Sequence, residues 1–361
     1  MRFAYSMAGE GRGHTTRGLG LGQALIDRGH EVRFFTSGDS PELLRARFGD
    51  DRVIEMDIPR LHYNRRGLDL IKTAWHNAPF FLRRGSKAKA ILPEVEAFRP
   101  DALICDFEPT MSAVARRLGL PLISFDCMHF VSECRLRGQL SLLDRCRIWP
   151  VALALRVMVR RPGLTVVAKP FDLPPRRSRA HLVGPVLRTS ILEGAWTPSR
   201  SHIVAYLRNS TRRILPALFE VARSRGLQVR FYGWVPEHLP EGAVHRPISE
   251  EGFLHDLMTS DLVIGTSGTQ LIGEVAHLGI PTILVPEPGQ IEQSVNAKLA
   301  EATCPRTEHV RVRDMAPARI EAALDELPTR SFMASVDGTQ RAADLIVSHI
   351  EQHLAPEGEG T

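Results

Sequence analysis

The first residues that could do chemistry lie in "GEGRGHTTR", residues 9–17, directly after the apolar run "RFAYSMA". Glycines allow a ligand to approach the backbone closely, and histidine titrates near neutral pH, so His14 is suited to general base catalysis. A dinucleotide-binding loop would instead have a third glycine at position 14 and an acidic residue about 20 residues further on. That glycine is missing and Asp39 is poorly spaced, which makes a dehydrogenase the least favoured interpretation.

A second group of polar residues opens a predicted helix in the other half of the chain. Thr266, Ser267, Gly268 and Thr269 follow the apolar run "DLVIG". A helix N-terminus offers unpaired N–H groups and a partial positive charge to phosphate oxygens, and the hydroxyls add donors. Glu274 lies about two turns along the same face, where a carboxylate could accept hydrogen bonds from both ribose hydroxyls. The alternative is a simple helix cap with a solvated glutamate.

The next predicted strand, "PTILVP", is followed by a loop and then by Glu292, Gln293 and Asn296. Ligands of doubly wound sheets bind outside the carboxyl ends of the strands, and this loop lies at the same edge as the previous one. A neighbouring carboxylate and amide suit hydrogen bonds to sugar hydroxyls. The two loops together therefore indicate a site for a phosphate and a sugar.

The elements that must position these residues are short apolar runs that alternate with helical patterns in both halves. Helices are predicted near 15–28, 93–98, 110–118, 214–225, 269–278 and 291–301. Gly29, Gly119, Gly226 and Gly279 fall where helix C-caps are expected. This alternation predicts an α/β fold with two Rossmann-like, doubly wound domains that face a central cleft.

The domain boundaries follow from the point at which the pattern restarts. We predict an amino-terminal Rossmann-like domain over 1–185, a linker over 186–200 and a second Rossmann-like domain over 201–334. A last helix, within 335–354, is expected to pack back on the first domain.

The second-half cluster resembles the donor-binding region of inverting glycosyltransferases with the two-domain GT-B fold. The S-G-x-x-x-x-x-E spacing from Ser267 to Glu274, followed by G-x-P and Q-x-x-N-A, is similar to the peptidoglycan N-acetylglucosaminyltransferases. The segment from Glu292 to Leu299 is similar to the ending shared by plant natural-product UDP-glycosyltransferases. The resemblance implies that Ser267 and Gly268 bind pyrophosphate, that Glu274 binds ribose, and that Glu292 with Gln293 binds the donor sugar. It also implies that the domain over 201–334 is the nucleotide-sugar-binding domain and that the domain over 1–185 binds the acceptor.

Two departures and two weaker placements accompany this resemblance. Thr266 stands where the plant pattern has a phosphate-contacting histidine, and the base-stacking tryptophan has no counterpart. Ile248 could flank the nucleotide base, and Arg208 could reach a phosphate or lie on the surface. A ribose-binding Glu274 favours a ribonucleotide, so the donor is expected to be a UDP-sugar that acts as co-substrate, with no other cofactor.

The first loop also matches this family, in which a G-x-G-H loop presents the catalytic base. The resemblance implies that His14 removes the proton of the acceptor hydroxyl and that Asp106, at the end of "ALICD", orients it. Gly11 and Gly13 would admit the acceptor. Arg17 and Glu108 are assigned to the same acceptor loop, with Glu108 as an alternative partner or base. Arg17 completes a "GEGRGHxxR" form similar to that of a group of bacterial and archaeal glycosyltransferase-like proteins.

The charge distribution and the composition limit the classes of partner that the chain is expected to bind. Residues 1–185 hold 30 Lys+Arg against 19 Asp+Glu, and 186–361 hold 16 against 22. The basic first half indicates either a solvated face or a contact with an anionic membrane surface or acceptor. Its basic stretches lack interleaved aromatic residues, which speaks against nucleic acid. The acceptor is expected to be a small molecule or lipid-linked.

The cysteines and the first residues of the chain indicate whether a metal site is expected and where in the cell the protein is expected to lie. The five scattered cysteines form neither a C-x-x-C motif nor a metal-like pairing with histidine, so no metal site is predicted. The chain opens without a secretory pattern, and the longest apolar run, 148–159, is too short for a membrane span. We expect a cytoplasmic protein, with the inner face of the membrane as an open alternative.

The function implied is an inverting, metal-independent glycosyltransferase of the hexosyltransferase type, with His14 as base and Asp106 in support. Two alternatives stay open at this point. One is a nucleotide-sugar epimerase or hydrolase on the same fold, and the other is a non-catalytic nucleotide-sugar-binding or membrane-scaffold protein.

Overall fold

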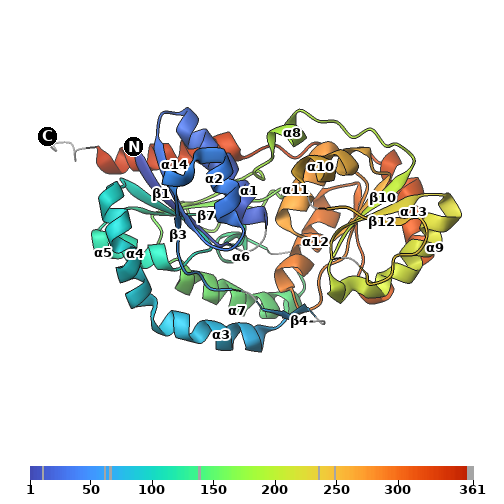
Figure 1. Ribbon diagram of the computed structural model, residues 1–361, viewed down its shortest axis with the longest axis horizontal. Coiled ribbons are helices and arrows are strands. Elements are labelled where there is room, and N and C mark those ends of the chain that lie inside the picture. Colours follow the sequence, from blue (N-terminus) through green and yellow to red (C-terminus); the bar gives the residue numbers. More distant parts are fainter. Residues whose placement is uncertain are drawn as a thin grey trace.

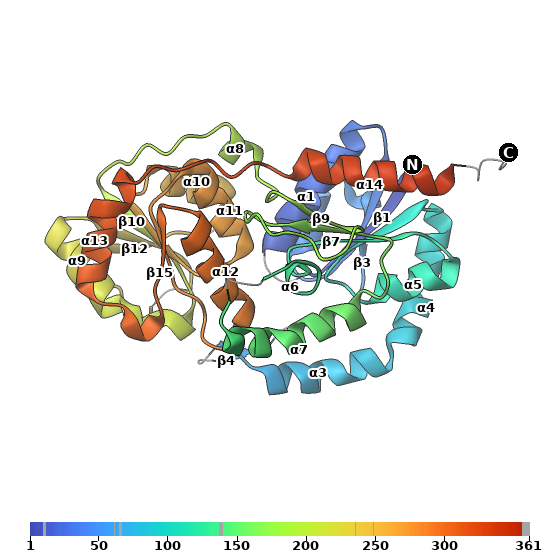
Figure 2. The same cartoon turned by 180° about the vertical axis from the view of Figure 1, so that it is seen from behind.

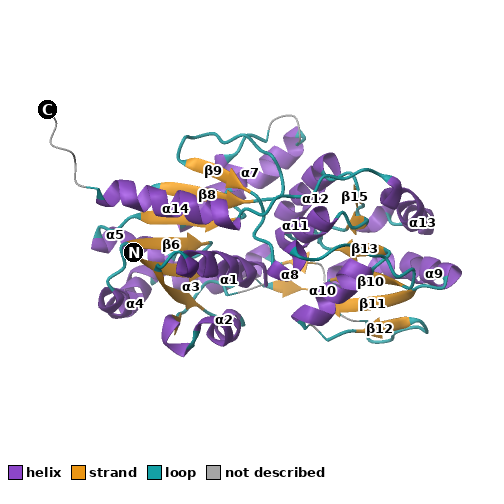
Figure 3. Cartoon of the chain, turned by 90° about the horizontal axis from the view of Figure 1, so that it is seen from above, coloured by secondary structure: helices purple, strands orange, loops and turns teal. Residues whose placement is uncertain are grey.

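A computed structural model describes residues 1–9, 12–60, 62–64, 67–136, 140–234, 236–247 and 249–355 of the chain. Two parallel sheets, each covered by helices, form the two halves of an elongated molecule (Figure 1). Seen from above, the halves lie side by side with α11 and α12 at their junction (Figure 3). The predicted pair of Rossmann-like sheets is therefore present.

The first sheet has seven parallel strands in the order β3-β2-β1-β6-β7-β8-β9. Its strands are β1 Arg2–Met7, β2 Glu31–Thr36, β3 Val53–Glu55, β6 Ala102–Asp106, β7 Leu122–Asp126, β8 Leu164–Ala168 and β9 Ala180–Val183. Strands β6, β7 and β8 are buried at every residue, which is why they read as continuous apolar runs. A separate antiparallel pair is formed by β4 Tyr63–Asn64 and β5 Gly67–Leu68.

The second sheet has six parallel strands in the order β12-β11-β10-β13-β14-β15. They are β10 His202–Leu207, β11 Gln228–Gly233, β12 Ala243–His245, β13 Leu262–Gly265, β14 Thr282–Leu284 and β15 Thr307–His309. The segment 184–201 connects the two sheets and contains the short helix α8, Thr189–Leu192.

Helices cover both faces of each sheet. Those of the first half are α1 Arg12–Asp27, α2 Ser40–Phe48, η1 Asp50–Arg52, α3 Leu70–Leu82, α4 Arg84–Phe98, α5 Thr110–Leu118, α6 Phe130–Glu133 and α7 Leu142–Met158. Those of the second half are η2 Asn209–Ile214, α9 Leu215–Arg225, α10 Glu250–Thr259, α11 Thr269–Leu278, α12 Ile291–Thr303, η3 Val312–Asp314, α13 Pro317–Glu326, η4 Leu327–Thr329 and α14 Thr339–Leu354.

The predicted helix ends are set by glycines in the left-handed region. Gly119 and Gly279 adopt φ of 67° as C-caps of α5 and α11, a conformation that disfavours other residues. The predicted helix at 93–98 is wrong at its start, because α4 begins at Arg84 and continues through Pro93. Burial of Ala88, Ile91 and Val95 against the first sheet outweighs the local preference of proline for a helix start.

The last helix, α14, returns to the first sheet. Its Ala342, Ala343, Ile346 and Ile350 belong to the core that surrounds β1, and Arg28, directly after α1, forms an ion pair with Asp344 at 2.6 Å. Figure 2 shows the segment that leads from the second half to α14 crossing over the top of the molecule.

One apolar cluster joins the halves. Phe130, Leu155 and Val167 of the first half pack with Ile272 and Val295 of the second. Within the described residues, no helix combines the length and apolar character needed to cross a membrane.

Candidate functional site

His14 and Asp106 meet where β1 and β6 end. The two strands pair in parallel with Met7 opposite Asp106, and α1, which follows β1, carries His14 in its first turn. His14 Nδ1 lies 2.9 Å from Asp106 Oδ1. The Asp106 side chain is fully buried, whereas 17% of the His14 side chain is exposed. The sequence thus predicted this pair from two segments about 90 residues apart.

Arg17 completes the cluster in a way that the sequence did not predict. Its Nε donates to Asp106 Oδ2 at 2.9 Å and its Nη2 to Asp106 Oδ1 at 3.0 Å. Arg17 lies one helical turn after His14, so both side chains project from the same face of α1. Its guanidinium is buried against Asp106, and the assignment of Arg17 to the acceptor loop stays a prediction.

The tautomer of His14 decides what this cluster can do. When Nδ1 carries the proton and donates it to Asp106, Nε2 is left as an acceptor that can take a proton from a ligand. Nη2 of Arg17, which can only donate, lies 2.8 Å from the same Nδ1 and hydrogen-bonds it only in the other tautomer, in which Nδ1 is unprotonated. The guanidinium balances the charge of Asp106, so the histidine can be neutral without leaving a buried carboxylate unpaired.

Phe107 flanks His14 and was not singled out in the sequence. Its ring stacks on that of His14, with centroids 6.2 Å apart and the planes 26° apart. Its φ of 56° places a bulky residue in the left-handed region, a strain that concentrates at functional sites. Its position directly after a strand-end aspartate was the only available signal.

Glu108 does not act as the partner of His14. It is fully buried, and its carboxylate accepts hydrogen bonds from the N–H groups of Thr110 and Met111 at the start of α5. Burial raises the pKa of Glu108 above its usual range, although these hydrogen bonds oppose the shift. Its carboxylate thus caps α5 and is not paired with His14, while its assignment to the acceptor loop and as an alternative base stays a prediction.

The N-terminus of α11 is open where the sequence predicted a phosphate. A methyl group built on Gly268, the N-cap residue, would meet no atom within 4 Å. The Ser267 hydroxyl is buried and is among the polar side-chain atoms without a partner in the described chain. Thr266 and Thr269 are buried on either side. An unpaired hydroxyl beside free helix N–H groups fits an anionic oxygen.

The loop that carries His14 and the N-terminus of α11 face each other across the junction of the halves. A methyl group built on Gly13, next to His14, would lie 3.9 Å from Cβ of Gln270 in the first turn of α11. The first turn of α1 and the first turn of α11 are thus in contact range, although about 250 residues separate them. His14 and the open N-terminus of α11 therefore belong to one site.

Lys169 links the halves at this site and was missed in the sequence. It follows β8 directly and is fully buried, and its Nζ donates to Thr269 Oγ1 at 2.6 Å and to Asn296 Oδ1 at 2.7 Å. Glu292 Oε1 lies 3.4 Å from the same Nζ. The ring centroid of Phe130 is 4.2 Å from it. A lysine that ends the apolar run "LTVVAK" at the carboxyl edge of a sheet was the available signal.

The remaining donor-site residues have the following partners. Glu292 Oε1 accepts from Asn296 Nδ2 at 2.7 Å, and Gln293 Oε1 accepts from the N–H of Glu287 at 2.9 Å. Glu274 is buried, accepts from Gln270 Nε2 at 2.8 Å and lies 3.4 Å from Arg188 Nε. Burial raises the pKa of Glu274, with Arg188 opposing the shift. Its predicted contact with ribose stays a prediction.

Three predicted site residues are either exposed or lie outside the described residues. Arg208 is exposed at the end of β10. Gly11 and Ile248 lie outside the described residues. Elsewhere in the described chain, no group of three or more His, Cys, Asp or Glu side chains is arranged to hold a metal ion.

The model of glycosyl transferase family 1 matches residues 1–328. The chain belongs to this family. An uncharacterized glycosyltransferase of Methanosarcina acetivorans is 25% identical over 324 residues, which are 83% of each chain. A UDP-N-acetylglucosamine–N-acetylmuramyl-(pentapeptide) pyrophosphoryl-undecaprenol N-acetylglucosamine transferase of Bordetella petrii is 26% identical over 328 residues, 84% of each chain.

Solved structures agree on the fold of this family 1 protein. The calicheamicin glycosyltransferase CalG4 superposes with a TM-score of 0.67 at 18% identity, over 99% of this chain and 100% of that one. The fold is GT-B, as predicted. The prediction that the protein is a glycosyltransferase is confirmed by the family match.

Proposed function

We propose that this glycosyltransferase moves a sugar from a UDP-sugar to an acceptor hydroxyl with inversion at the anomeric carbon. The observation that carries the proposal is the contact between the first turns of α1 and α11. It sets a histidine with a buried aspartate opposite an open helix N-terminus, which are the two parts that such a transfer requires.

The donor phosphates occupy the N-terminus of α11 in this proposal. Ser267 supplies a hydroxyl and the first turn of α11 supplies N–H groups, while Gly268 leaves room for close approach because its own N–H donates to the Thr266 carbonyl. The helix dipole offsets the negative charge that grows on the leaving diphosphate. Lys169 adds a cation that touches Thr269 in the same turn. The sugar lies toward Glu292 and Gln293, whose carboxylate and amide bind its hydroxyls.

The acceptor reacts at His14. Nε2 takes the hydroxyl proton while the acceptor oxygen forms its bond to the anomeric carbon. The bond from that carbon to the diphosphate oxygen breaks on the opposite face, so the configuration inverts and the nucleoside diphosphate leaves. Asp106 holds the Nδ1 proton and stabilises the imidazolium that forms.

The test is a screen of nucleotide sugars for binding by calorimetry, followed by acceptor profiling with the best donor. UDP and thymidine diphosphate are compared directly, because only the first carries the 2′-hydroxyl that Glu274 is expected to bind. Proton NMR of the product then gives its anomeric configuration. An inverted glycoside is expected. A retained configuration would overturn the mechanism, and an epimer or free sugar formed without acceptor would favour the alternative activities.

We also propose that the protein works at an anionic membrane surface. Helices α3 and α7 run along the lower edge of the molecule in both Figure 1 and Figure 2. Trp75 of α3 is 79% exposed and Trp149 of α7 is 65% exposed. Arg145, Arg147 and Arg156 of α7 accompany these apolar side chains. Tryptophan beside arginine suits the boundary between anionic headgroups and acyl chains.

Flotation with vesicles of phosphatidylglycerol and phosphatidylcholine tests this second proposal. The wild type is expected to float at low salt, and the Trp75→Ser/Trp149→Ser variant to float much less. Met333→Ser/Val336→Ser removes two equally exposed apolar side chains from another part of the surface and serves as the control. No flotation of the wild type, or equal losses in both variants, would overturn the proposal.

A further inference from the structure

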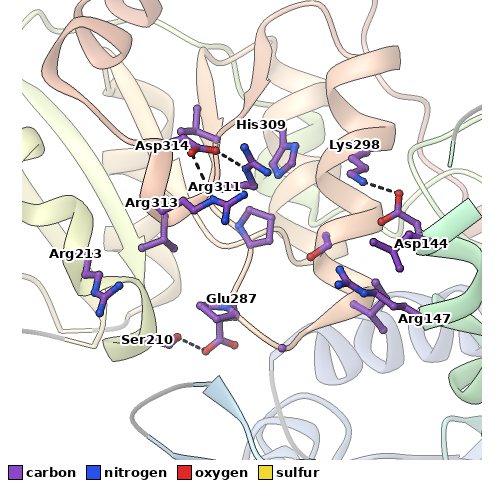
Figure 4. Close-up of a pocket in the computed structure, with 18 of the residues that line it drawn as sticks. Asp144, Arg147, Ser210, Arg213, Glu287, Lys298, His309, Arg311, Arg313 and Asp314 are labelled. Atoms are coloured by element: carbon purple, nitrogen blue, oxygen red, sulfur yellow. Dashed lines mark hydrogen bonds and ion pairs between the residues drawn. The ribbon is translucent and has the colours of Figure 1, made fainter. Parts of the chain in front are cut away.

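A large cavity lies beside the proposed donor site. It has a volume of about 1130 Å³ and is bounded by α7, the loop from β14 to α12 and the segment that follows β15. Its walls thus come from both halves of the molecule. Figure 4 shows Arg147 of α7 and Arg213 of η2 on opposite sides of it, with Arg311 and Arg313 between them.

The lining of this cavity is strongly basic. Seven of its 21 lining residues are Lys or Arg and three are Asp or Glu. Asp314 pairs with both Arg311 and Arg313, and Lys298 Nζ lies 2.6 Å from Asp144 Oδ2. Glu287 accepts a hydrogen bond from Ser210 Oγ at 2.9 Å. The three acids are therefore all engaged, and the basic excess faces the cavity.

Two of the arginines have no partner. Among the residues that the structure describes, neither the Arg147 side chain nor the Arg213 side chain forms a hydrogen bond or an ion pair. A guanidinium presents a planar fork of donors that matches two oxygens of a phosphate. Each of the two can therefore bind phosphate oxygens that enter the cavity.

We propose that this cavity binds the phosphate ester group of the acceptor. The inference rests on the proposed function, which assigns the donor phosphates to Ser267 and Gly268, and neither of these residues lines the cavity. The wall residues Glu287 and Gly289 belong to the loop that leads into Glu292 and Gln293. A phosphate held here thus places its carrier next to the donor sugar.

Both halves of the molecule contribute an arginine to this cavity. Arg147 belongs to a helix of the first sheet and Arg213 to the segment after β10 of the second. A phosphate in the cavity thus lies between basic side chains of both halves. Leu143 of α7 lines the cavity and is 58% exposed, so the phosphate can be carried either by a small soluble molecule or by a lipid.

The experiment measures binding by the full-length protein, without any sugar transfer. Glycerol 3-phosphate is titrated by calorimetry as the soluble probe, and vesicles of phosphatidylcholine with phosphatidic acid are the membrane probe. The variant Arg147→Gln/Arg213→Gln is compared with Arg117→Gln/Arg223→Gln, which removes two exposed charges outside the cavity. Loss of two charge-assisted contacts is expected to weaken binding by about 30-fold in the first variant and not in the control.

Every outcome decides the proposal. Arginine-dependent binding of the soluble probe supports a small phosphorylated acceptor, and arginine-dependent binding of the vesicles alone supports a lipid phosphate. No binding by the wild type to either probe, or equal binding by both double variants, overturns it. Because turnover is not measured, failure of the proposed sugar transfer would leave this binding result interpretable by itself.

Discussion

The first sheet carries two His–Asp pairs at the ends of neighbouring strands, and they differ in almost every respect. His14 and Asp106 lie at the end of β6, with Nδ1 and Oδ1 2.9 Å apart. His129 and Asp126 lie at the end of β7, with Nδ1 and Oδ2 2.5 Å apart. His129 is buried, whereas the His14 side chain is partly exposed and the neighbouring Gly13 lies against the first turn of α11.

The partners of the two aspartates explain the difference. Asp126 accepts from the N–H groups of Met128 and His129, from Ser124 Oγ and from the His129 ring. Burial raises the pKa of Asp126, but the His129 charge and these hydrogen bonds lower it more, so it stays below its usual range. Burial lowers the pKa of His129, but Asp126 more than offsets this and raises it.

Asp106 is balanced by Arg17 instead. In the β7 pair the positive charge of the His129 imidazolium balances Asp126. Loss of its proton would leave that buried carboxylate without a counter-charge. In the β6 pair an arginine provides that charge permanently, and the histidine is free to gain and lose a proton during a reaction. A His–Asp contact alone therefore does not indicate a catalytic base.

The largest expected effect separates the two histidines by activity. His14→Ala removes the proposed base and should lower kcat about 1000-fold, within the range of general base catalysis. His129→Gln keeps a hydrogen bond to Asp126 and should leave kcat close to wild type. Steady-state kinetics with a saturating donor measures both. Wild-type turnover by His14→Ala, or an equal loss in His129→Gln, would remove the distinction between the pairs.

The second prediction compares the two histidines by the pH dependence of the free energy of unfolding. Because the folded pKa of His129 lies above its unfolded value of about 6.5, its contribution is complete below that pH and is lost as pH rises through the folded pKa. The free energy of unfolding should fall over this interval in the wild type and in His14→Gln, but not in His129→Gln. Urea unfolding at a series of pH values measures it, and a decline that persists in His129→Gln would contradict the assignment.

The smallest effect concerns Arg17. Arg17→Met removes the permanent counter-charge of the buried Asp106 carboxylate, so the His14–Asp106 pair should be held less well and kcat should fall about 10-fold. Arg17→Lys keeps a positive charge beside Asp106 and should lose less. Steady-state kinetics of both variants measures the effect. Wild-type kcat in Arg17→Met, or equal losses in both variants, would show that the Arg17 charge does not support the pair.

Much of the site was predictable because parallel strands end at a common edge. Asp106 and His14 could be paired from sequence since each directly follows or ends an apolar run, and Ser267 and Gly268 open a helix after another. Local patterns do not give side-chain direction, so the contacts of Arg17 with Asp106 and of Glu108 with the start of α5 could not be predicted.

Lys169 and the basic cavity depend on contacts between the halves, which no local pattern contains. The pair Asp126 and His129 was visible in "SFDCMHF", since an aspartate that ends a strand precedes the histidine by three residues. What could not be predicted is that this pair is sealed by Ser124 and the backbone.

The return of α14 to the first sheet also fixes an order of events during synthesis. The core around β1 includes Ile346 and Ile350 and is incomplete until nearly the whole chain has been made. The main core of the second sheet needs nothing beyond Leu327. Domains usually fold from the amino terminus as they emerge from the ribosome. Here the half that is translated last can complete its core first, and the half that carries His14 closes only when the final helix arrives.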